Sequence, residues 1–389
     1  MAFKHGITIT EIDTGARTIS AVATAVIGLV AIASDANAAT FPLDKPVLIT
    51  DLADAISKAG TNGTLASSLR AISAIVSTPV VVVRVEEGGD AAETASNVIG
   101  GDVAGEKTGM QALLAARAQT MAQPKILIAP GLETQAVTKA LAVVAKKLRA
   151  FAYARVVGDT VAEAGLYRAN FDERELMLVT PDWLVWDTVT SANGTGHAAA
   201  YAGAMRALID QQYGPQKTLS NVPVPSVLGI TKDFYWDIEN MASDVGVLNQ
   251  AHVTSLIRTD AGYRFWGNRT CAADTSLYKY ESTVRVAQLL TDTIAKGMLW
   301  AVDKPLTPSL TRDIIETING FFRQLKAQGV VLGANAWFDS ALNSVESLKA
   351  GKLRIDYDYT VPPPLEDLGF NQRITDKYLA DFSAALSEA

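Results

Sequence analysis

Cysteine and histidine are scarce in this sequence of 389 residues. The single cysteine, Cys271, excludes a disulfide within the chain and any cysteine-rich metal site. The three histidines, His5, His197 and His252, lie far apart and show no spacing typical of metal ligands. We therefore expect the chain to hold no metal ion.

An excess of positive charge is also missing. The chain has 34 Lys and Arg against 41 Asp and Glu, so its formal net charge is −7. This balance gives no general electrostatic reason to bind nucleic acid. Hydrophobic residues make up 49% of the sequence, which is typical of a globular protein. A chain of this length predicts two or three compact units rather than one small core.

No apolar run is long enough for a membrane span. The uncharged run at residues 20–34 falls short of the roughly 20 residues that a bilayer requires. Residues 36–38 (Ala-Asn-Ala) imitate a signal-peptide cleavage site, but Glu11 and Asp13 precede the run where a signal peptide would be basic. We interpret residues 26–32 as a buried central strand and expect no export and no direct membrane contact.

The segment 20–255 alternates short apolar strands with helical patterns, which predicts a doubly wound, mostly parallel α/β sheet. Residues 86–109 are rich in Gly, Asp, Glu and Ala and indicate a loop or a weak helix. Strands are expected at 25–32, 47–50, 79–85, 125–130, 150–155 and 175–180, and helices at 52–59, 65–76, 110–121, 134–148, 160–168 and 197–212.

Two glycines, Gly194 and Gly196, carry the main enzymatic alternative. With Ala199 they form a weak G-x-G-x-x-A dinucleotide fingerprint between a strand and a helix. No strand with a terminal acidic residue follows about 20 residues later, as that fold requires. His197 is the only candidate base of the domain, and no G-x-S-x-G nucleophile elbow is present. We predict that His197 begins a helix and that the domain has no catalytic residues and no cofactor.

The last part of the chain indicates a separate α+β unit. A long helix is expected at 275–302, and Thr311 is expected to cap a second helix at 311–328. The apolar residues of this second helix follow one face. Its other face carries Arg312, Arg323 and Lys326.

Two extended segments follow these helices. Residues 352–361 alternate strictly, with Leu353, Ile355, Tyr357, Tyr359 and Val361 on one side. After the prolines at 362–364, residues 368–374 predict a second strand. Residues 6–13 alternate in the same way at the other end of the chain.

An aromatic motif lies between these parts. Tyr263, Phe265 and Trp266 stand close to Gly262 and Gly267, whose missing Cβ suits turns. The run Trp266-Gly267-Asn268-Arg269-Thr270 resembles the W-G-x-R-T signature of contractile-tail sheath proteins, found in phages such as P2 and in R-type pyocins. Local matches at 202–205 (Ala-Gly-Ala-Met) and in the C-terminal strands extend this resemblance over much of the chain.

The resemblance implies an α/β plus α+β fold. An outer, subtilisin-like α/β domain (20–255) would be inserted into an inner α+β domain (256–361). Extended arms would occupy residues 1–19 and 362–389. Because the arms are strand-forming but too poor in apolar groups to build a core, they fit strands that are donated to neighbouring subunits.

The implied function is structural. Subunits would polymerise as stacked, six-fold rings around a tail tube and contract without consuming nucleotide, driving the tube through a bacterial envelope. The implied partners are further copies of the chain, the tube protein, and baseplate and tail terminator proteins. The protein would be assembled in the bacterial cytoplasm and reside in the virion tail. A nucleotide-dependent enzyme and a non-polymerising binding module remain the alternatives.

These implications assign roles to particular residues. Gly15, Gly369 and the prolines at 362–364 would serve as arm hinges. The predicted arm residues are Ile7, Thr8, Ile9, Thr10, Leu368, Phe370 and Ile374; the acceptor strand contains Leu353, Ile355, Tyr357 and Tyr359; the tube-facing candidates are Arg312, Arg323 and Lys326; the motif comprises Gly262, Trp266, Gly267, Arg269 and Thr270.

Overall fold

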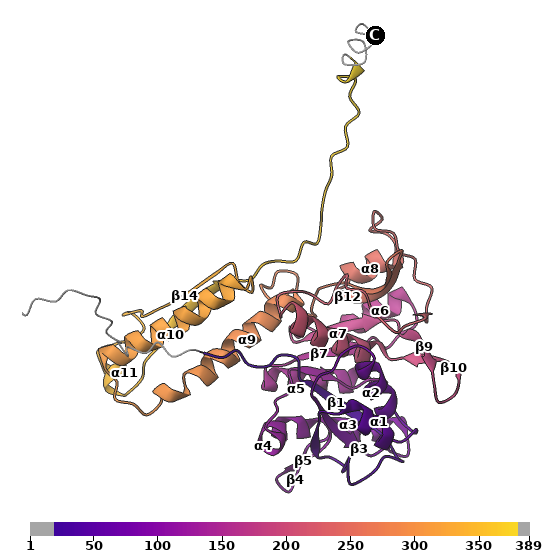
Figure 1. Ribbon diagram of the computed structural model, residues 1–389, viewed down its shortest axis with the longest axis horizontal. Helices are drawn as coiled ribbons and strands as arrows, with labels where there is room; N and C mark the ends of the chain where they lie inside the picture. Colours follow the sequence, from indigo (N-terminus) through magenta and orange to yellow (C-terminus); the bar gives the residue numbers. More distant parts are fainter. Residues whose placement is uncertain (1–18, 380–389) are drawn as a thin grey trace, which may run out of the picture.

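The computed structural model describes residues 19–379 (Figure 1). The predicted strand residues Ile7, Thr8, Ile9 and Thr10, and the proposed hinge at Gly15, lie outside this range. Within the described residues the chain forms a large α/β body and a smaller helical unit, from which the C-terminal segment projects (Figure 1).

A mixed sheet of eight strands forms the centre of the body. Its six inner strands are parallel, and an antiparallel strand closes each edge. The chain winds from β1 toward both edges, as the alternating pattern predicted. In spatial order the strands are β13 (Gly262–Trp266), β12 (Val253–Thr259), β8 (Leu176–Thr180), β7 (Phe151–Arg155), β6 (Ile126–Ile128), β1 (Ile27–Ile32), β3 (Val80–Val85) and β2 (Pro46–Ile49).

Helices cover both faces of this sheet, so the central strands β1 and β3 are buried at every position and apolar except at Arg84. The β1 strand is buried at every position, with Leu29 facing one core and Val30 the other. One face carries α1 (Leu52–Lys58), α2 (Leu65–Ser73) and α7 (Ala198–Gln212); the other carries α3 (Ala91–Ile99), the 3₁₀ helix η1 (Gly109–Ala115), α4 (Ala116–Thr120), α5 (Gln135–Leu148), α6 (Val161–Arg168) and α8 (Asp244–Gln250).

Two small sheets are attached to the body. The hairpin β4 (Asp102–Val103) and β5 (Glu106–Lys107) follows α3, in a region where the sequence indicated a loop or weak helix. A second sheet pairs β9 (Trp183–Asp187) with β10 (Ala192–Gly196) and β11 (Gly229–Ile230).

The large sheet extends further along the chain than the sequence suggested. The expected boundary between residues 255 and 256 falls inside β12, which pairs with β8 on one side and β13 on the other. Leu256 and Phe265 belong to one core of the sheet, and Cys271 belongs to the other. The body therefore continues to about Cys271.

The helical unit has its own core. It comprises α9 (Glu281–Gly297), the 3₁₀ helix η2 (Leu299–Ala301), α10 (Pro308–Ala327), β14 (Gly333–Trp337), α11 (Val345–Lys349) and β15 (Asp356–Thr360). Leu290 of α9 and Phe322 of α10 meet in this core. Ile19 joins them, and a Cβ on Gly297 would come within 3.0 Å of the Ile19 side chain. The first described residues thus pack with the last third of the chain.

Three helix predictions need correction. The helix expected at 275–302 begins only at Glu281, because Lys279 and Asn268 accept hydrogen bonds that keep residues 275–280 against the motif. Thr311 does not cap α10: the N-cap is Thr307, whose hydroxyl accepts from the Leu310 N–H at 3.2 Å, and Pro308 occupies the first turn. The helix expected at 110–121 is divided into η1 and α4. Among residues 19–379, no helix has both the length and the apolar character to cross a bilayer.

Candidate functional site

The glycines of the enzymatic alternative lie in a hairpin. Gly194 and Gly196 belong to β10 and are paired antiparallel with Val185 and Trp183 of β9. A phosphate loop needs backbone N–H groups gathered at a helix start, whereas here the glycines are part of a strand ladder. The dinucleotide interpretation of these glycines is therefore wrong.

His197 is the N-cap residue of α7, as the sequence predicted. Burial lowers the pKa of its imidazole, and Asp182 and Arg155 are the charged groups that influence it. Within the described part of the chain, no group of three or more His, Cys, Asp and Glu side chains is placed to hold a metal ion.

The aromatic motif closes one edge of the sheet. Gly262 forms the β12–β13 turn with φ of 101°, and Phe265 packs edge-on against Trp183 with 5.5 Å between ring centroids. Trp266 points the other way and contacts Trp236 at the same centroid distance. Gly267 has φ of 140°, and a Cβ there would lie 2.7 Å from the Thr254 hydroxyl. Both glycines are thus required by backbone geometry.

The end of the motif connects the body to distant segments. Thr270 is fully buried, and its hydroxyl donates to the Tyr278 carbonyl at 3.1 Å. The guanidinium of Arg269 donates to the carboxylate of Glu366, which lies 97 residues further along the chain. Sequence reasoning assigned no role to Glu366, because an acidic residue after a proline run has no local signature.

The predicted acceptor strand is part of a two-stranded sheet. β15 pairs only with β14 among the described residues, so each strand has a free edge. Leu353, Ile355 and Tyr359 are half-buried against the helical core, as the alternation predicted. Tyr357 is 37% exposed, although its ring lies 5.9 Å from that of Phe322. Leu353 and Ile355 precede the ladder, which begins at Asp356.

The C-terminal segment is extended and projects away from the molecule (Figure 1). The second strand expected at 368–374 makes no ladder in the described chain. Leu368, Phe370 and Ile374 are 62%, 84% and 100% exposed. A segment with alternating apolar residues therefore lies in solvent without a partner strand among residues 19–379.

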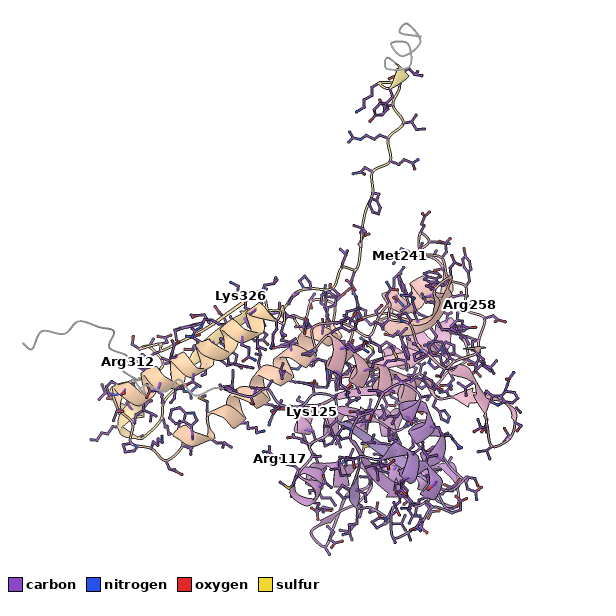
Figure 2. All side chains as sticks on the ribbon, viewed as in Figure 1. Arg117, Lys125, Met241, Arg258, Arg312 and Lys326 are labelled. Atoms are coloured by element: carbon purple, nitrogen blue, oxygen red, sulfur yellow. The ribbon has the colours of Figure 1, made fainter. Side chains whose placement is uncertain are left out.

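The three basic candidates lie on the exposed face of α10. Arg312 and Lys326 mark its two ends in Figure 2, and Arg323 is also exposed. Arg323 forms an ion pair with Glu316 at 2.5 Å. The opposite face of the helix contributes Ile318, Phe321, Phe322 and other residues to the core, so the amphipathic prediction is confirmed.

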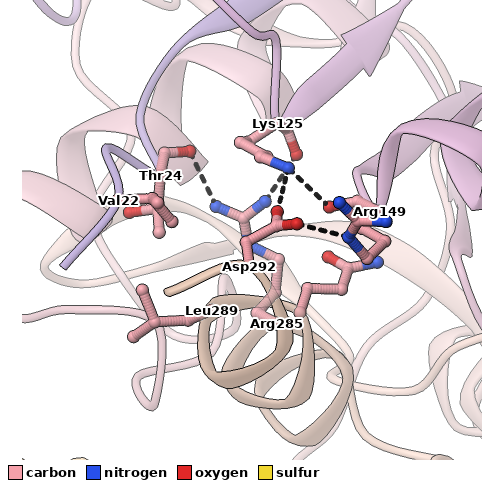
Figure 3. Close-up of a pocket in the computed structure, with 8 residues that line it drawn as sticks. Val22, Thr24, Lys125, Arg149, Arg285, Leu289 and Asp292 are labelled. Atoms are coloured by element: carbon pink, nitrogen blue, oxygen red, sulfur yellow. Dashed lines mark hydrogen bonds and ion pairs between the residues drawn. The ribbon is translucent and has the colours of Figure 1, made fainter. Parts of the chain in front are cut away.

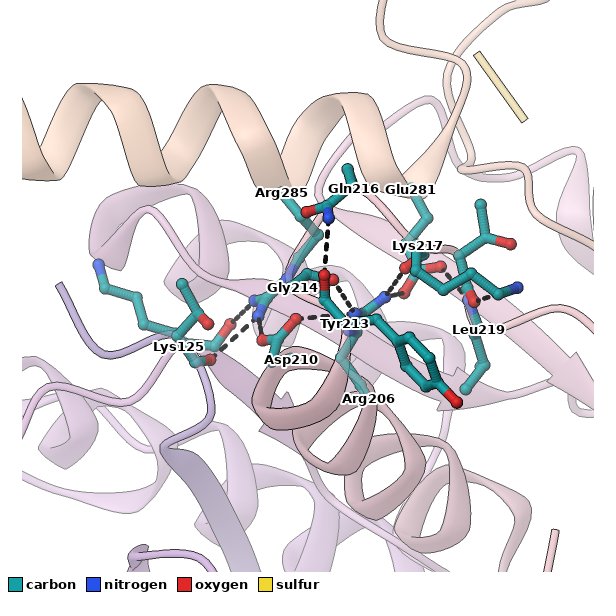
Figure 4. Close-up of polar contacts among 12 residues, drawn as sticks. Lys125, Arg206, Asp210, Tyr213, Gly214, Gln216, Lys217, Leu219, Glu281 and Arg285 are labelled. Atoms are coloured by element: carbon teal, nitrogen blue, oxygen red, sulfur yellow. Dashed lines mark hydrogen bonds and ion pairs between the residues drawn. The ribbon is translucent and has the colours of Figure 1, made fainter. Parts of the chain in front are cut away.

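A buried charge network, which sequence reasoning missed, attaches α9 to the body (Figure 4). Arg206 of α7 is fully buried and pairs with Asp210 at 2.7 Å and with Glu281 at 3.3 Å. Glu281 also accepts from the Leu219 N–H at 2.8 Å and from the Tyr153 hydroxyl. Burial raises the pKa of Tyr153 well above its usual value, so the hydroxyl remains a donor.

A second group of charged side chains includes two residues of α9: Arg285, one turn after Glu281, and Asp292, further along the same helix (Figure 3). Asp292 accepts from Lys125 and Arg149, and Arg285 donates to Asp210 and to the Lys125 carbonyl. Burial lowers the pKa of Lys125. The space enclosed by these side chains has a volume of about 10 Å³, no more than one water requires, and Lys125, Arg149 and Asp292 also line an adjoining cavity of about 480 Å³. The group joins α9 to the body.

Three protein families match consecutive parts of the chain. They are described as tail sheath protein Gp18 domain III N-terminal region (residues 24–85), phage tail sheath protein central domain (residues 105–271) and phage tail sheath C-terminal domain (residues 273–375). The division between the second and third falls where the large sheet ends.

Individual proteins give the same result. The tail sheath protein of Escherichia phage P2 is 51% identical over 393 aligned residues, which cover 99% of both chains. The sheath complex of an extracellular contractile injection system in the contracted state has the same fold, with a TM-score of 0.73, 17% identity and coverage of 97% and 99%. A subunit of the 6-fold symmetrised baseplate of the anti-feeding prophage matches with a TM-score of 0.70 at 18% identity, covering 96% of this chain and all of the other.

Proposed function

This chain belongs to the phage tail sheath family and is a structural subunit of a contractile sheath in the virion tail, and from that premise we propose how its parts connect it to neighbouring subunits and to the tube. The family is not enzymatic. The α/β body is the outer domain, and the helical unit is the inner domain that faces the tube. The body is an insertion within the inner domain; the shared core of Ile19 with α9 and α10 supports this arrangement.

The terminal arms link subunits by strand donation. Residues 368–374 of one copy add to the β14–β15 sheet of a second copy, and residues 6–13 add to the same sheet. One observation carries this proposal: in the described part of the chain, an extended segment exposes Leu368, Phe370 and Ile374, and the two-stranded β14–β15 sheet has two free edges. Free edges and unpaired apolar strands are sites of strand addition between chains.

The energy of such a link comes mainly from the backbone. Each added backbone hydrogen bond contributes roughly 0.5–1.5 kcal/mol net, so a strand with several of them holds two subunits together. The donated apolar side chains would extend the inward face of β15, where Tyr357 is incompletely covered within one subunit. Such a link can survive contraction because it does not depend on how the α/β bodies contact each other.

The remaining partners follow from the same arrangement. The exposed basic residues Arg312, Arg323 and Lys326 face acidic groups of the tube. The subunits form six-fold rings, and the terminal rings contact the baseplate and the tail terminator. The 6-fold symmetry of the anti-feeding prophage baseplate, which contains a subunit of this fold, supports the ring order. Better packing of the bodies in the contracted state, rather than nucleotide hydrolysis, supplies the energy.

Truncation of either arm tests the linkage. A chain ending at Asp367, or one lacking residues 1–14, should remain folded and soluble but should form no sheath in electron micrographs or sedimentation. Val345→Ser is a matched control, because Val345 is an apolar side chain 76% exposed on α11 and outside the arms; this variant should still assemble. Contractile tubes formed by either truncated chain would refute strand donation.

A further inference from the structure

The root of the C-terminal arm is held against the rest of the molecule. After β15, Val361, Pro362 and Pro364 are half-buried, and the chain becomes fully exposed only from Leu365 onward. Glu366 differs from its exposed neighbours, because both oxygens of its carboxylate accept hydrogen bonds. The side chain of Glu366 is 29% exposed.

The contact with Glu366 is a fork. Arg269 Nε donates to Glu366 Oε1 at 2.9 Å, and Nη2 donates to Oε2 at 3.0 Å. The hydroxyl of Tyr280 donates to Oε2 at 2.9 Å. Two parallel N–H donors fix the orientation of a carboxylate as well as its position, which a lysine cannot do. Burial opposes ionisation of Glu366, but these donors outweigh it and lower the pKa of the carboxyl.

Arg269 is itself fixed in place. Its third nitrogen, Nη1, donates to Asp274 and lies 3.1 Å from His252 Nε2. The three segments that meet at the fork belong to different parts of the fold. Arg269 follows β13 of the body, Tyr280 is the N-cap of α9, and a β-bridge joins these two residues. Glu366 therefore links the arm to the junction of the body and the helical unit.

Between Glu366 and residue 379, where the described chain ends, no side chain makes a comparable contact. Residues 367–374 are exposed throughout, and no atom lies within 4 Å of the position that a Cβ on Gly369 would occupy. A residue without Cβ reaches more backbone conformations than any other. The point at which the arm can change direction thus lies after the fork and not at the proline run.

We propose that Arg269 and Tyr280 form a clamp on Glu366 which fixes the root of the C-terminal arm, so that the arm pivots beyond Asp367, at residues 368–369, rather than at Pro362–Pro364. The clamp is an attachment within one subunit; its use in a sheath rests on the proposed strand donation. Force on the arm passes through Glu366 to both units at once. Arg269 of the aromatic motif is therefore a residue that positions the arm.

Spin labels on the soluble, full-length subunit test the clamp without requiring assembly. Cys271 is buried, so a label on Asp367→Cys or Asn371→Cys reports one site. At a concentration where the subunit is monomeric, the label at 367 should give a slow-motion spectrum and the label at 371 a fast one. Glu366→Gln should shift the spectrum at 367 to fast motion and leave 371 unchanged. Equal mobility at 367 and 371 before this substitution would overturn the proposal.

Two further variants separate the clamp from a general loss of structure. Arg269→Lys keeps the charge but removes the fork, and should shift position 367 in the same direction as Glu366→Gln. Glu316→Gln removes an exposed ion pair on α10 and should leave the label at 367 slow. If the label at 367 moves fast in the clamp variants and these variants still form sheaths, the clamp is confirmed. Strand donation is then independent of the clamp. If position 367 stays slow in both variants, the clamp is refuted whether or not the arm donates a strand.

Discussion

Glu281, in the first turn of α9, contacts Arg206 in the middle of α7, with 3.3 Å between Oε1 and Nη1 and neither side chain accessible to solvent. Asp210 provides the second carboxylate for Arg206. The contact joins the helical unit to the α/β body through the protein interior, where charges are stable only when paired. The two units are thus connected by a polar joint, by the burial of Val284 of α9 in a core of the body, and by the chain itself.

Glu281→Ala should weaken this joint strongly. Removing one partner of a buried ion pair leaves an unpaired charge and typically costs about 3–5 kcal/mol. Urea unfolding followed by circular dichroism measures the change. Glu316→Gln, at an exposed pair, should change the free energy of unfolding by no more than about 1 kcal/mol. Equal effects of the two substitutions would show that Glu281 is not essential to the joint.

Thr307 and Thr311 should differ in their contribution to α10. Thr307→Ala removes the hydroxyl that accepts from Leu310 and should cost about 1 kcal/mol. Thr311→Ala removes only a hydroxyl that donates to the Thr307 carbonyl at 3.2 Å, and should cost less than about 0.5 kcal/mol. Thermal unfolding of the two variants decides between the observed cap and the one that the sequence suggested.

Glu133 should make stability depend on pH. Desolvation raises the pKa of its carboxyl to about 7, with a further contribution from Asp182 and an opposing one from Arg155. Because the folded pKa is above the unfolded value, the folded chain binds the extra proton between about pH 4.5 and 7, and the free energy of unfolding falls as pH rises through that window. Glu133→Gln removes this dependence.

The comparison of variant and parent isolates the Glu133 effect. His197, whose pKa is lowered by burial, changes stability in the opposite direction and is present in both proteins. The stability of Glu133→Gln relative to the parent should therefore increase from pH 5 to pH 7 and stay level above it. Parallel pH profiles of the two proteins in urea titrations would contradict the assignment.

Charge reversal at Arg323 and Lys326 should weaken assembly on the tube. Exposed ion pairs contribute roughly 0–1 kcal/mol each, so the effect depends on repetition over many subunits and should grow as salt is lowered. Co-sedimentation of sheath subunit with purified tube measures it. Reversal of Lys146 and Lys147, which are exposed on α5 of the body, is the matched control and should leave co-sedimentation unchanged. Unaltered tube binding by the α10 variant would assign tube contact to another surface.

Several elements were predictable from the sequence because local physics determines them. Residues 27–32 carry no polar side chain and residues 80–85 are apolar except for Arg84, which suits strands covered on both faces, and both are central parallel strands. The α10 residues Ile318, Phe321 and Leu325 repeat at helical spacing and line the core. The aromatic motif was recognisable from its resemblance to a family signature, and the structure explains its glycines: both have positive φ, and Gly267 also lies too close to Thr254 for a Cβ.

Other features depended on which segments meet in space. The apolar pattern of β12 is the same whichever sheet it joins, so the boundary at 255 could not be excluded beforehand. The glycines Gly194 and Gly196 are compatible with either a phosphate loop or a hairpin. Only the antiparallel pairing of β10 with β9 shows that they form a hairpin. Thr307 and Thr311 both precede a helical pattern, and the hydroxyl contact selects the former.

By itself, the sequence determined that this protein has an α/β body and an amphipathic helical unit, because each follows from residue spacing along a few consecutive turns or strands. That its two ends form strands stays a prediction. The tertiary structure alone decided the pairing of Arg206 with Glu281 and of Arg269 with Glu366, across 75 and 97 residues. The sequence around a charged residue does not identify its ion-pair partner. The partner is determined by how the sheet, α7 and α9 pack together.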